Sequence, residues 1–270
     1  MLPKEKTPPK KSLSDLSILA YGPSKIGKSS WCSHAPNALF LATEPGLNHL
    51  DVYQSPITTW EELLAACMEI AKGDHPFQTI IIDTIDNAYR MCEKFICDKH
   101  NISHESDFGY GKGYALVNNE FQRVILKLAQ FPYGLFLVSH SKMTEIETRT
   151  GKRSRIVPTL PNKASEFILG LVDIILFCDQ DIMQEPNASP VVRRVMRTKP
   201  HPNYEAGDRT DRLPALIDLD FSKFLAAFNG SEANSTGPTP TDKQKPEKNK
   251  ADAARPTETK PQTTKKGATR

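Results

Sequence analysis

The hydrophobic positions of this chain form short runs that alternate with longer segments of helical periodicity. Apolar runs typical of buried strands occupy 16–21, 38–43, 78–83, 134–139, 171–178 and 191–198, with a seventh at 215–219. Between them, apolar residues recur at helical spacing in 59–72, 84–100, 114–130 and 162–170. Strands that alternate with helices predict an α/β fold, with a mainly parallel sheet flanked by helices on both faces.

The pattern ends near Asn229, where the composition changes to Pro, Thr, Lys, Ser and Asn with almost no large apolar residue. Such a segment buries too little surface to offset its ordering entropy, so residues 230–270 are predicted to be disordered. A tether for nucleic acid or a partner protein and a solvated tail without a dedicated role both fit this composition. The chain is therefore divided into a basic N-terminal tail (1–13), a core (14–229) and the C-terminal tail.

Charge is distributed unevenly along the chain. Residues 1–11 hold four lysines and one glutamate, and residues 229–270 hold nine basic and five acidic residues, while the whole chain carries a net charge of +3. The core is therefore net acidic, so any nucleic-acid binding must use local loops or the tails. The five cysteines are odd in number, which suits reduced thiols in a cytoplasm. No apolar signal segment or membrane-spanning stretch is found, so we expect a cytoplasmic protein without membrane contact.

One octet carries the most specific chemistry. Residues 22–29 match the phosphate-binding pattern G-x-x-x-x-G-K-[ST], between a predicted strand and a segment that can open a helix. In this setting the backbone N–H groups cradle phosphates, Lys28 reaches the β- and γ-phosphates, and the Ser29 hydroxyl ligates Mg²⁺. The expected nucleotide-binding residues are Gly22, Pro23, Ser24, Lys25, Ile26, Gly27, Lys28, Ser29 and Ser30. The sequence thus predicts a site for ATP and Mg²⁺.

Three residues at other strand ends complete the predicted site. Asp83 closes an Ile-rich run and is expected to hold Mg²⁺ through water beside Ser29. Glu44 follows the 38–43 strand and is the candidate base that orients the attacking water, with Asp86 as a weaker alternative better explained as a charge at a helix N-terminus. His140 follows the 134–139 strand and is a candidate sensor of the γ-phosphate. A surface Glu before a Pro-Gly turn and a structural His stay open as alternatives.

The order of these motifs (phosphate loop, Thr-Glu-Pro-Gly after a strand, Ile-Ile-Ile-Asp, Leu-Val-Ser-His) resembles the RecA-like ATPase core. More narrowly, it is similar to the phage-encoded, core-only RecA-like ATP-binding proteins of recombination and single-strand annealing. The resemblance covers roughly residues 14–228. It implies that Glu44 occupies the place of the catalytic glutamate and His140 that of the polar sensor, although RecA itself carries Gln there. It also implies DNA-facing loops at the carboxyl edge of the sheet.

Two segments are candidates for those loops. The first is 107–114, where glycines give mobility, Lys112 can meet a phosphate and Tyr110 or Tyr114 can stack on bases. The second is 141–157, which is locally basic on an acidic core and so suits a phosphate backbone. Its basic residues are Lys142, Arg149, Lys152, Arg153 and Arg155. A glycine-rich lead into a helix and an exposed hairpin without a ligand are the respective alternatives.

RecA-like assemblies bind ATP between subunits, and a neighbour supplies a cation to the γ-phosphate. Lys199 resembles that element, with Arg197 and Arg209 as alternatives, and a solvated basic strand end is an equal one. The resemblance therefore implies a homo-oligomer, either a ring or a filament. A zinc site from Cys92, Cys97, His100 and His104 is disfavoured, because Cys92 is poorly placed on the helix and no second pair with zinc spacing exists.

The leading hypothesis is a Mg²⁺-dependent ATPase that acts on single-stranded DNA during recombination or annealing. A small-molecule or nucleoside kinase is the second, for which no lid or acceptor pocket is evident in the sequence. The third is a non-catalytic ATP-binding scaffold that recruits a single-strand-binding protein through its tail. Replacement of Glu44 separates the first from the third, because it abolishes turnover only in a hydrolase.

Overall fold

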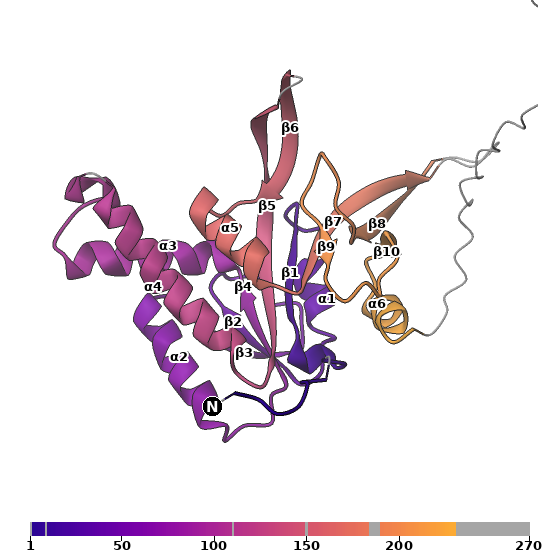
Figure 1. Ribbon diagram of the computed structural model, residues 1–270, viewed down its shortest axis with the longest axis horizontal. Helices are drawn as coiled ribbons and strands as arrows, with labels where there is room; N and C mark the ends of the chain where they lie inside the picture. Colours follow the sequence, from indigo (N-terminus) through magenta and orange to yellow (C-terminus); the bar gives the residue numbers. More distant parts are fainter. Residues whose placement is uncertain (1, 9, 110, 149–150, 184–189, 231–270) are drawn as a thin grey trace, which may run out of the picture. The chain divides into compact units, whose positions relative to one another are not determined.

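The computed structural model describes residues 2–8, 10–109, 111–148, 151–183 and 190–230. They fall in one compact unit, Met1–Ala233, and the predicted disordered tail lies outside the described residues. A ten-stranded sheet organises the unit (Figure 1). Its strands are β1 Ser17–Gly22, β2 Ala38–Ala42, β3 Tyr53–Pro56, β4 Thr79–Asp83, β5 Gly134–Thr148, β6 Gly151–Pro158, β7 Ile174–Met183, β8 Val191–Arg197, β9 Gly207–Asp208 and β10 Leu216–Asp218.

The sheet is mixed but mostly parallel in its centre, as predicted. Its order is β10-β8-β7-β1-β5-β4-β2-β3, with β6 paired to β5 and β9 paired to β7. The strands β7, β1, β5, β4, β2 and β3 are parallel neighbours, whereas β8 and β10 are antiparallel additions at one edge. The parallel arrangement brings the carboxyl ends of β1, β2 and β4 to one edge of the sheet, level with His140 within β5, and this edge is where α/β proteins bind ligands.

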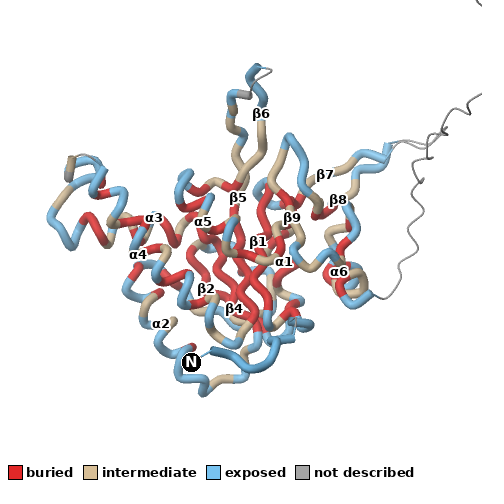
Figure 2. Tube along the Cα trace, viewed as in Figure 1, coloured by how far each residue is buried: buried red, intermediate tan, exposed pale blue. Residues whose placement is uncertain are grey.

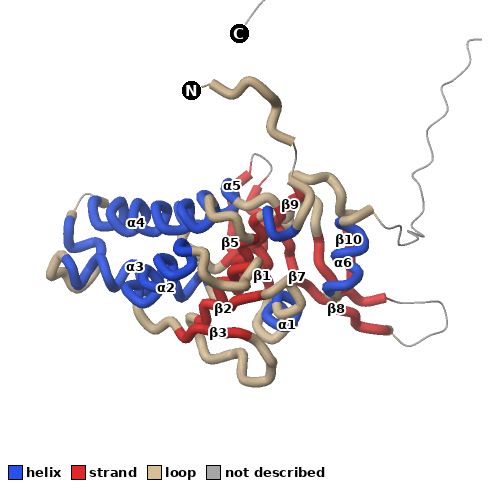
Figure 3. Tube along the Cα trace, turned by 90° about the horizontal axis from the view of Figure 1, so that it is seen from below, coloured by secondary structure: helices blue, strands red, loops and turns tan. Residues whose placement is uncertain are grey.

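Helices cover both faces of this sheet (Figures 1 and 3). They are α1 Lys28–Cys32, α2 Trp60–Lys72, α3 Ile85–Lys99, α4 Lys112–Ala129, α5 Asn162–Leu171 and α6 Phe221–Phe228, with short 3₁₀ turns at Leu13–Asp15 and Glu105–Phe108. The start of α2 is fixed by a capping box in which Thr59 and Glu62 exchange side-chain and backbone hydrogen bonds. Among the described residues, no helix has both the length and the apolarity needed to cross a membrane.

Alternating side chains of the central strands feed two hydrophobic cores. Leu19 and Ile82 belong to the core under α2–α5, whereas Ile18 and Ile81 belong to the core under α1 and α6. Burial on both faces makes these strands continuously apolar rather than alternating, which is why they are recognisable in the sequence. Figure 2 shows the buried strands as the centre of the unit.

The structure differs from the sequence prediction mainly at the edges. The predicted strand 134–139 continues to Thr148 and pairs with β6 as a long antiparallel hairpin. The predicted strand 171–178 begins later, at Ile174, and runs on to Met183, with its outer part paired to β8. Helix α6 and the short strands β3 and β9 were not predicted. Strands β3 and β9 have four and two residues. Helix α6 buries Phe221, Phe224 and Phe228, but at eight residues it is shorter than the window over which helical periodicity is recognised.

Candidate nucleotide-binding site

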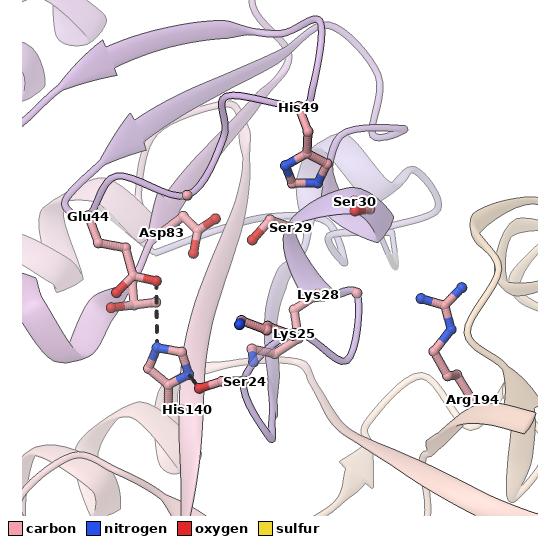
Figure 4. A pocket seen from close by; sticks show the side chains of 13 residues that line it. Ser24, Lys25, Lys28, Ser29, Ser30, Glu44, His49, Asp83, His140 and Arg194 are labelled. Atoms are coloured by element: carbon pink, nitrogen blue, oxygen red, sulfur yellow. Dashed lines mark hydrogen bonds and ion pairs between the residues drawn. The ribbon is translucent and has the colours of Figure 1, made fainter. Parts of the chain in front are cut away.

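The phosphate-binding loop joins β1 to α1 at the carboxyl edge of the sheet. Gly27 precedes the first helical residue with φ 114°, a left-handed conformation that favours glycine and turns the backbone into α1. The loop lines a cavity of about 690 Å³. The other residues that line it come from the segment after β2, from the end of β4 and the residue after it, from β5 and from β8: Glu44, Gly46, His49, Asp83, Thr84, His140 and Arg194. Figure 4 shows how Glu44, His49, Asp83, His140 and Arg194 lie around the loop.

Lys28 is buried, with 5% of its surface exposed, and its ammonium donates to the carbonyl oxygens of Gly22 (3.0 Å) and Pro23 (2.9 Å). Burial lowers its pKa, and this outweighs the opposite effect of nearby acidic groups including Asp83, Asp86 and Glu44. The side chain thus folds back on its own loop. A phosphate in the cavity would offer this ammonium a stronger, charged acceptor than two carbonyls.

Asp83 ends β4 beside the first turn of α1. It is 4% exposed, and burial raises the pKa of its carboxyl group, although a hydrogen bond from Ser29 opposes the shift. A buried carboxylate next to a hydroxyl is a donor set of hard oxygen atoms, which suits Mg²⁺. The residues present therefore fit the cation that the loop implies, and Ser29 and Asp83 would hold it.

Glu44 and His140 lie next to each other at the phosphate loop. The Glu44 Oε1 to His140 Nε2 distance is 3.5 Å, and the His140 Nδ1 lies 3.2 Å from the Ser24 hydroxyl. Asn87, in the first turn of α3, donates to Glu44 Oε2 at 3.1 Å. A chain of polar contacts therefore runs from α3 through Glu44 and His140 to the phosphate loop (Figure 4). The predicted base and the predicted sensor touch each other.

The position of Glu44 follows from the residue before it. The Thr43 hydroxyl donates to the carbonyl of Thr84 at 2.8 Å and accepts from the Thr84 N–H at 2.7 Å. The Thr43 N–H also donates to the Asp83 carbonyl at 2.8 Å. These bonds join the ends of β2 and β4, so the carboxylates of Glu44 and Asp83 are presented from one braced edge.

Asp86 is not placed as a base. Its two oxygens accept from the Ser139 hydroxyl and from the His140 N–H, both at 2.7 Å, and it is 5% exposed. Burial raises the pKa of this carboxyl group more than the two hydrogen bonds lower it. Through these two hydrogen bonds Asp86 fixes the backbone of β5 at His140.

Replacing Asp86 by Ala is expected to lower the free energy of unfolding by about 2 kcal/mol, because two buried donors lose their acceptor. ATP turnover should fall as well, since His140 loses its anchor. Urea denaturation and a turnover assay measure the two effects. Asp98→Ala is the control, because Asp98 is exposed and pairs only with Lys94, and it should change stability by less than about 0.5 kcal/mol. Equal stability of the two variants would show that Asp86 does not fix the backbone of β5.

Arg194 is a site residue that the sequence analysis missed. It comes from β8, and its Nη1 donates to the Ile26 carbonyl of the phosphate loop at 3.2 Å. His49 also lines the cavity from the loop after β2. Nothing local in the sequence marks either residue. Arg194 reaches the loop only because β7 lies beside β1 and β8 folds back along β7.

The three candidate in-trans cations are engaged within the chain. Lys199 pairs with Asp211 at 2.8 Å, Arg197 pairs with Asp179 at 3.1 Å and Asp181 at 3.4 Å, and Arg209 donates to the carbonyls of Gly170 and Leu171. None of the three lines the cavity. A role in a neighbouring subunit's site stays a prediction, and Lys199 would have to leave Asp211 to fulfil it.

The 141–157 segment is the β5–β6 hairpin, and its pairing sorts the charges by face. Cross-strand partners share a face, and residues two apart along a strand do too. One face carries Lys142, Thr144, Ile146, Arg153 and Arg155, whereas the other carries Met143, Glu145, Glu147 and Lys152. Lys152, which was grouped with the basic residues, therefore lies on the acidic face, 3.9 Å from Glu145. Arg149 lies outside the described residues.

Two residues of the basic face are held in place. Arg155 pairs with Glu205 at 3.0 Å, and Lys142 donates to the Leu160 carbonyl at 3.0 Å. Arg153, nearer the tip, is exposed. The basic face of the hairpin therefore has one exposed cation near its tip, Arg153, and two cations with partners nearer its base, Lys142 and Arg155.

The 107–114 segment does not lie beside the cavity. Helix α3 leads away from the sheet edge over 15 residues, roughly 22 Å, so the turn into α4 is at the outer end of the α3–α4 pair (Figures 1 and 3). Lys112 is exposed there as the first residue of α4, and Tyr114 is 41% exposed. Tyr110 lies outside the described residues. A DNA-facing role for this segment stays a prediction, but its distance from the nucleotide cavity argues against direct coupling.

The disfavoured zinc site is not assembled either. Cys92 is buried and donates to the Val117 carbonyl. Among the described residues, the one group of potential ligands within reach of each other is Glu93, His104 and Glu105. The His104 Nδ1 accepts from the Ser106 N–H at 3.1 Å, so the proton of the neutral ring is on the Nε2 that faces Glu93. Both ring nitrogens of His104 therefore have partners within the chain.

Comparison with known proteins agrees with this geometry. Residues 14–210 match the AAA_24 family, described as an AAA domain. The chain therefore belongs to this family of P-loop nucleotide-binding proteins. It is also 22% identical over 184 residues to the SPbeta prophage-derived uncharacterized protein YorG of Bacillus subtilis (strain 168), a match that spans 65% of this chain and 54% of that protein. The chain thus aligns with about half the length of this relative.

Proposed function

We propose that this protein is a Mg²⁺-dependent ATPase that acts on single-stranded DNA in phage-type recombination or annealing. The observation that carries the proposal is the convergence of Lys28, Ser29, Asp83, Glu44 and His140 on one cavity. Family membership supports nucleotide binding, and the similarity to a prophage-derived protein supports a phage setting. The action on DNA rests on the resemblance to RecA-like proteins and on the basic face of the β5–β6 hairpin.

The residues divide the work of hydrolysis. The loop N–H groups and Lys28 bind the phosphates, with Lys28 exchanging its carbonyl acceptors for phosphate oxygens. Ser29 and Asp83 would hold Mg²⁺, which when bound would neutralise the charge that develops on the phosphate oxygens. Glu44 orients the attacking water and accepts its proton. His140, which contacts both Glu44 and Ser24, is placed to respond to the terminal phosphate.

Strand β5 offers a physical connection between hydrolysis and DNA. His140 is in this strand, and the same strand continues without interruption to Thr148 in the hairpin. A shift of His140 against Asp86 or Glu44 would therefore move the basic face directly. In the opposite direction, DNA bound to that face would bias the position of His140, which is a route to DNA-stimulated turnover.

The proposal is tested by measuring ATP hydrolysis with and without single-stranded DNA, using the full chain and Lys28→Ala. We expect DNA to raise turnover and the substitution to abolish it in both conditions. Turnover that ignores DNA would contradict the DNA-dependent part of the proposal. Absence of both turnover and ATP binding in the unaltered chain would contradict it entirely, and binding without turnover would favour a nucleotide-gated scaffold.

The charge sorting of the hairpin gives a matched pair of variants. Arg153→Ala should lower DNA stimulation and weaken DNA binding about 3- to 10-fold, since it removes one exposed cation from the basic face. Lys152→Ala, one residue away on the acidic face, should change DNA binding less than about twofold. Both variants should keep the basal ATPase rate. Titration of labelled single-stranded DNA at two salt concentrations measures the difference, and equal losses from both variants would refute the assignment of faces.

A further inference from the structure

A second cavity, of about 380 Å³, adjoins the phosphate cavity. The two share Gly27, Ser30 and Arg194. The walls of the second cavity, here called the side cavity, come from α1 and from the segment that leads from β10 into α6: Trp31, His34, Leu219, Asp220, Phe221 and Ser222. Trp31 packs tilted against Phe221 at 5.3 Å between ring centroids, so part of this wall is a fixed aromatic cluster.

The chemistry of the phosphate cavity fixes the direction in which a nucleotide would lie. Glu44 and His140, the groups suited to the terminal phosphate, are on one side of Lys28, and Arg194 is on the opposite side (Figure 4). A nucleoside triphosphate is linear along its phosphates. With its γ-phosphate near Glu44, its ribose and base must leave the loop past Ser30, toward Arg194 and the side cavity.

Arg194 differs from the other arginines of β8 in its partners. Arg193 and Arg197 share a strand face with Asp179 and Asp181. Arg193 pairs with Asp181 and Asp218, and Arg197 pairs with Asp179 and Asp181. Arg194 points to the other face and faces Gln180 across the ladder. Arg194 as a whole is exposed, and its guanidinium has no carboxylate within ion-pairing distance in the described part of the chain. One of its N–H groups holds the Ile26 carbonyl, which leaves the planar group at the junction of the two cavities.

We infer that Arg194 is a specificity-determining residue that binds the nucleoside end of the nucleotide, with the base and ribose in the side cavity. The inference rests on the proposed function, because it assumes nucleotide in the phosphate cavity. A planar guanidinium packs against a base or ribose and also donates hydrogen bonds in its plane. The hydrogen bond to the Ile26 carbonyl aligns that plane with the loop. The same side chain would therefore contact both the nucleotide and the phosphate loop.

The test compares ligands that contain the nucleoside with one that lacks it. Binding of ATP, ADP and inorganic tripolyphosphate, each with Mg²⁺, is measured by titration calorimetry for the unaltered chain and for Arg194→Lys. The Lys variant keeps the charge and a donor for the Ile26 carbonyl but loses the planar group. Arg193→Ala is the control, because it alters the same strand on the opposite face.

We expect Arg194→Lys to weaken ATP and ADP binding by about tenfold each, and tripolyphosphate binding by less than about twofold. Equal loss for all three ligands would mean that Arg194 only supports the loop or binds phosphate, and unchanged affinities would mean that it binds nothing; either result overturns the inference. Loss confined to ATP would place it at the γ-phosphate and also overturn it. If the unaltered chain binds none of the ligands, the proposed function fails first.

Trp31 supplies a readout that a merely structural Arg194 would not affect. The chain has two tryptophans, and Trp60 belongs to the core under α2–α5, whereas Trp31 belongs to the core under α1 and α6. The substitution Trp60→Phe therefore leaves Trp31 as the one indole fluorophore. In that background, ADP should change the emission of Trp31 while tripolyphosphate should not. An equal response to both ligands would contradict a nucleoside in the side cavity.

Discussion

Glu44→Gln is expected to reduce ATP turnover at least about 100-fold while nucleotide affinity stays within about threefold of the unaltered chain. The amide cannot accept a proton from the attacking water, and loss of a general base typically costs between 10² and 10⁴ in rate. The fold should survive, because the amide oxygen can still accept from Asn87, as Glu44 Oε2 does at 3.1 Å. The Glu44 side chain is one-third exposed, so no large apolar contact is lost.

The measurement is a single-turnover assay beside calorimetric ATP binding, since this combination separates chemistry from affinity. Glu69→Gln is the control, because Glu69 is an exposed carboxylate on α2 that pairs with Lys72 away from the cavity. It should leave both quantities unchanged. Substantial turnover in Glu44→Gln would remove Glu44 from the mechanism and would point to a water held by other groups of the cavity.

Gly22→Ala is expected to lower the melting temperature by about 10 °C or to prevent folding. A β-carbon at Gly22 would lie 2.2 Å from the carbonyl oxygen of Cys178 and 3.1 Å from its carbonyl carbon, both of which are backbone atoms of β7. Strand β7 cannot yield, since it pairs with β1 on one side and with β8 on the other. Overpacking in a core costs about 1–3 kcal/mol, and a clash with a fixed backbone is at the upper end or beyond.

Gly170→Ala separates this effect from the general consequences of adding a methyl group. Gly170 is in helix α5, and a β-carbon there would meet nothing within 4 Å. The change should raise the melting temperature slightly, because alanine favours the helix by about 1 kcal/mol relative to glycine. Differential scanning calorimetry of both variants without nucleotide measures the contrast. A stable Gly22→Ala protein would show that β1 and β7 can separate.

The sequence could predict those parts of the site that directly follow a recognisable strand in the chain. The central strands are continuously apolar because both faces are buried, and the phosphate loop and Asp83 follow such strands directly. Parallel strands end at one edge, so Glu44 and His140 are expected near each other, and in the structure they lie 3.5 Å apart, with His140 inside the longer strand β5. Their roles in hydrolysis stay predictions. The sequence therefore predicts the positions of those site residues that depend only on strand direction.

Other residues depend on sheet order or on exposed strands, which a single sequence does not specify. Arg194 contacts Ile26 of the loop, which lies 168 positions earlier in the chain, and Asp86 binds His140 of β5, which lies 54 positions later. The outer half of β5 is polar on both faces, with Lys142 and Thr144 on one face and Glu145 and Glu147 on the other, and this polarity is typical of a loop as much as of an exposed hairpin. The turn into α4 was assigned to the wrong place because the length of α3 separates it from the sheet edge.

The alternating faces of the β5–β6 hairpin also constrain how its length can vary. Removing two residues from each strand shortens its reach by about 7 Å and leaves the cations on the same side. Removing one residue from each strand turns the outer part over, so that Glu145 and Glu147 would replace Arg153 on that side. Homologues with hairpins of different lengths should therefore differ by even numbers of residues per strand, unless a bulge restores the parity.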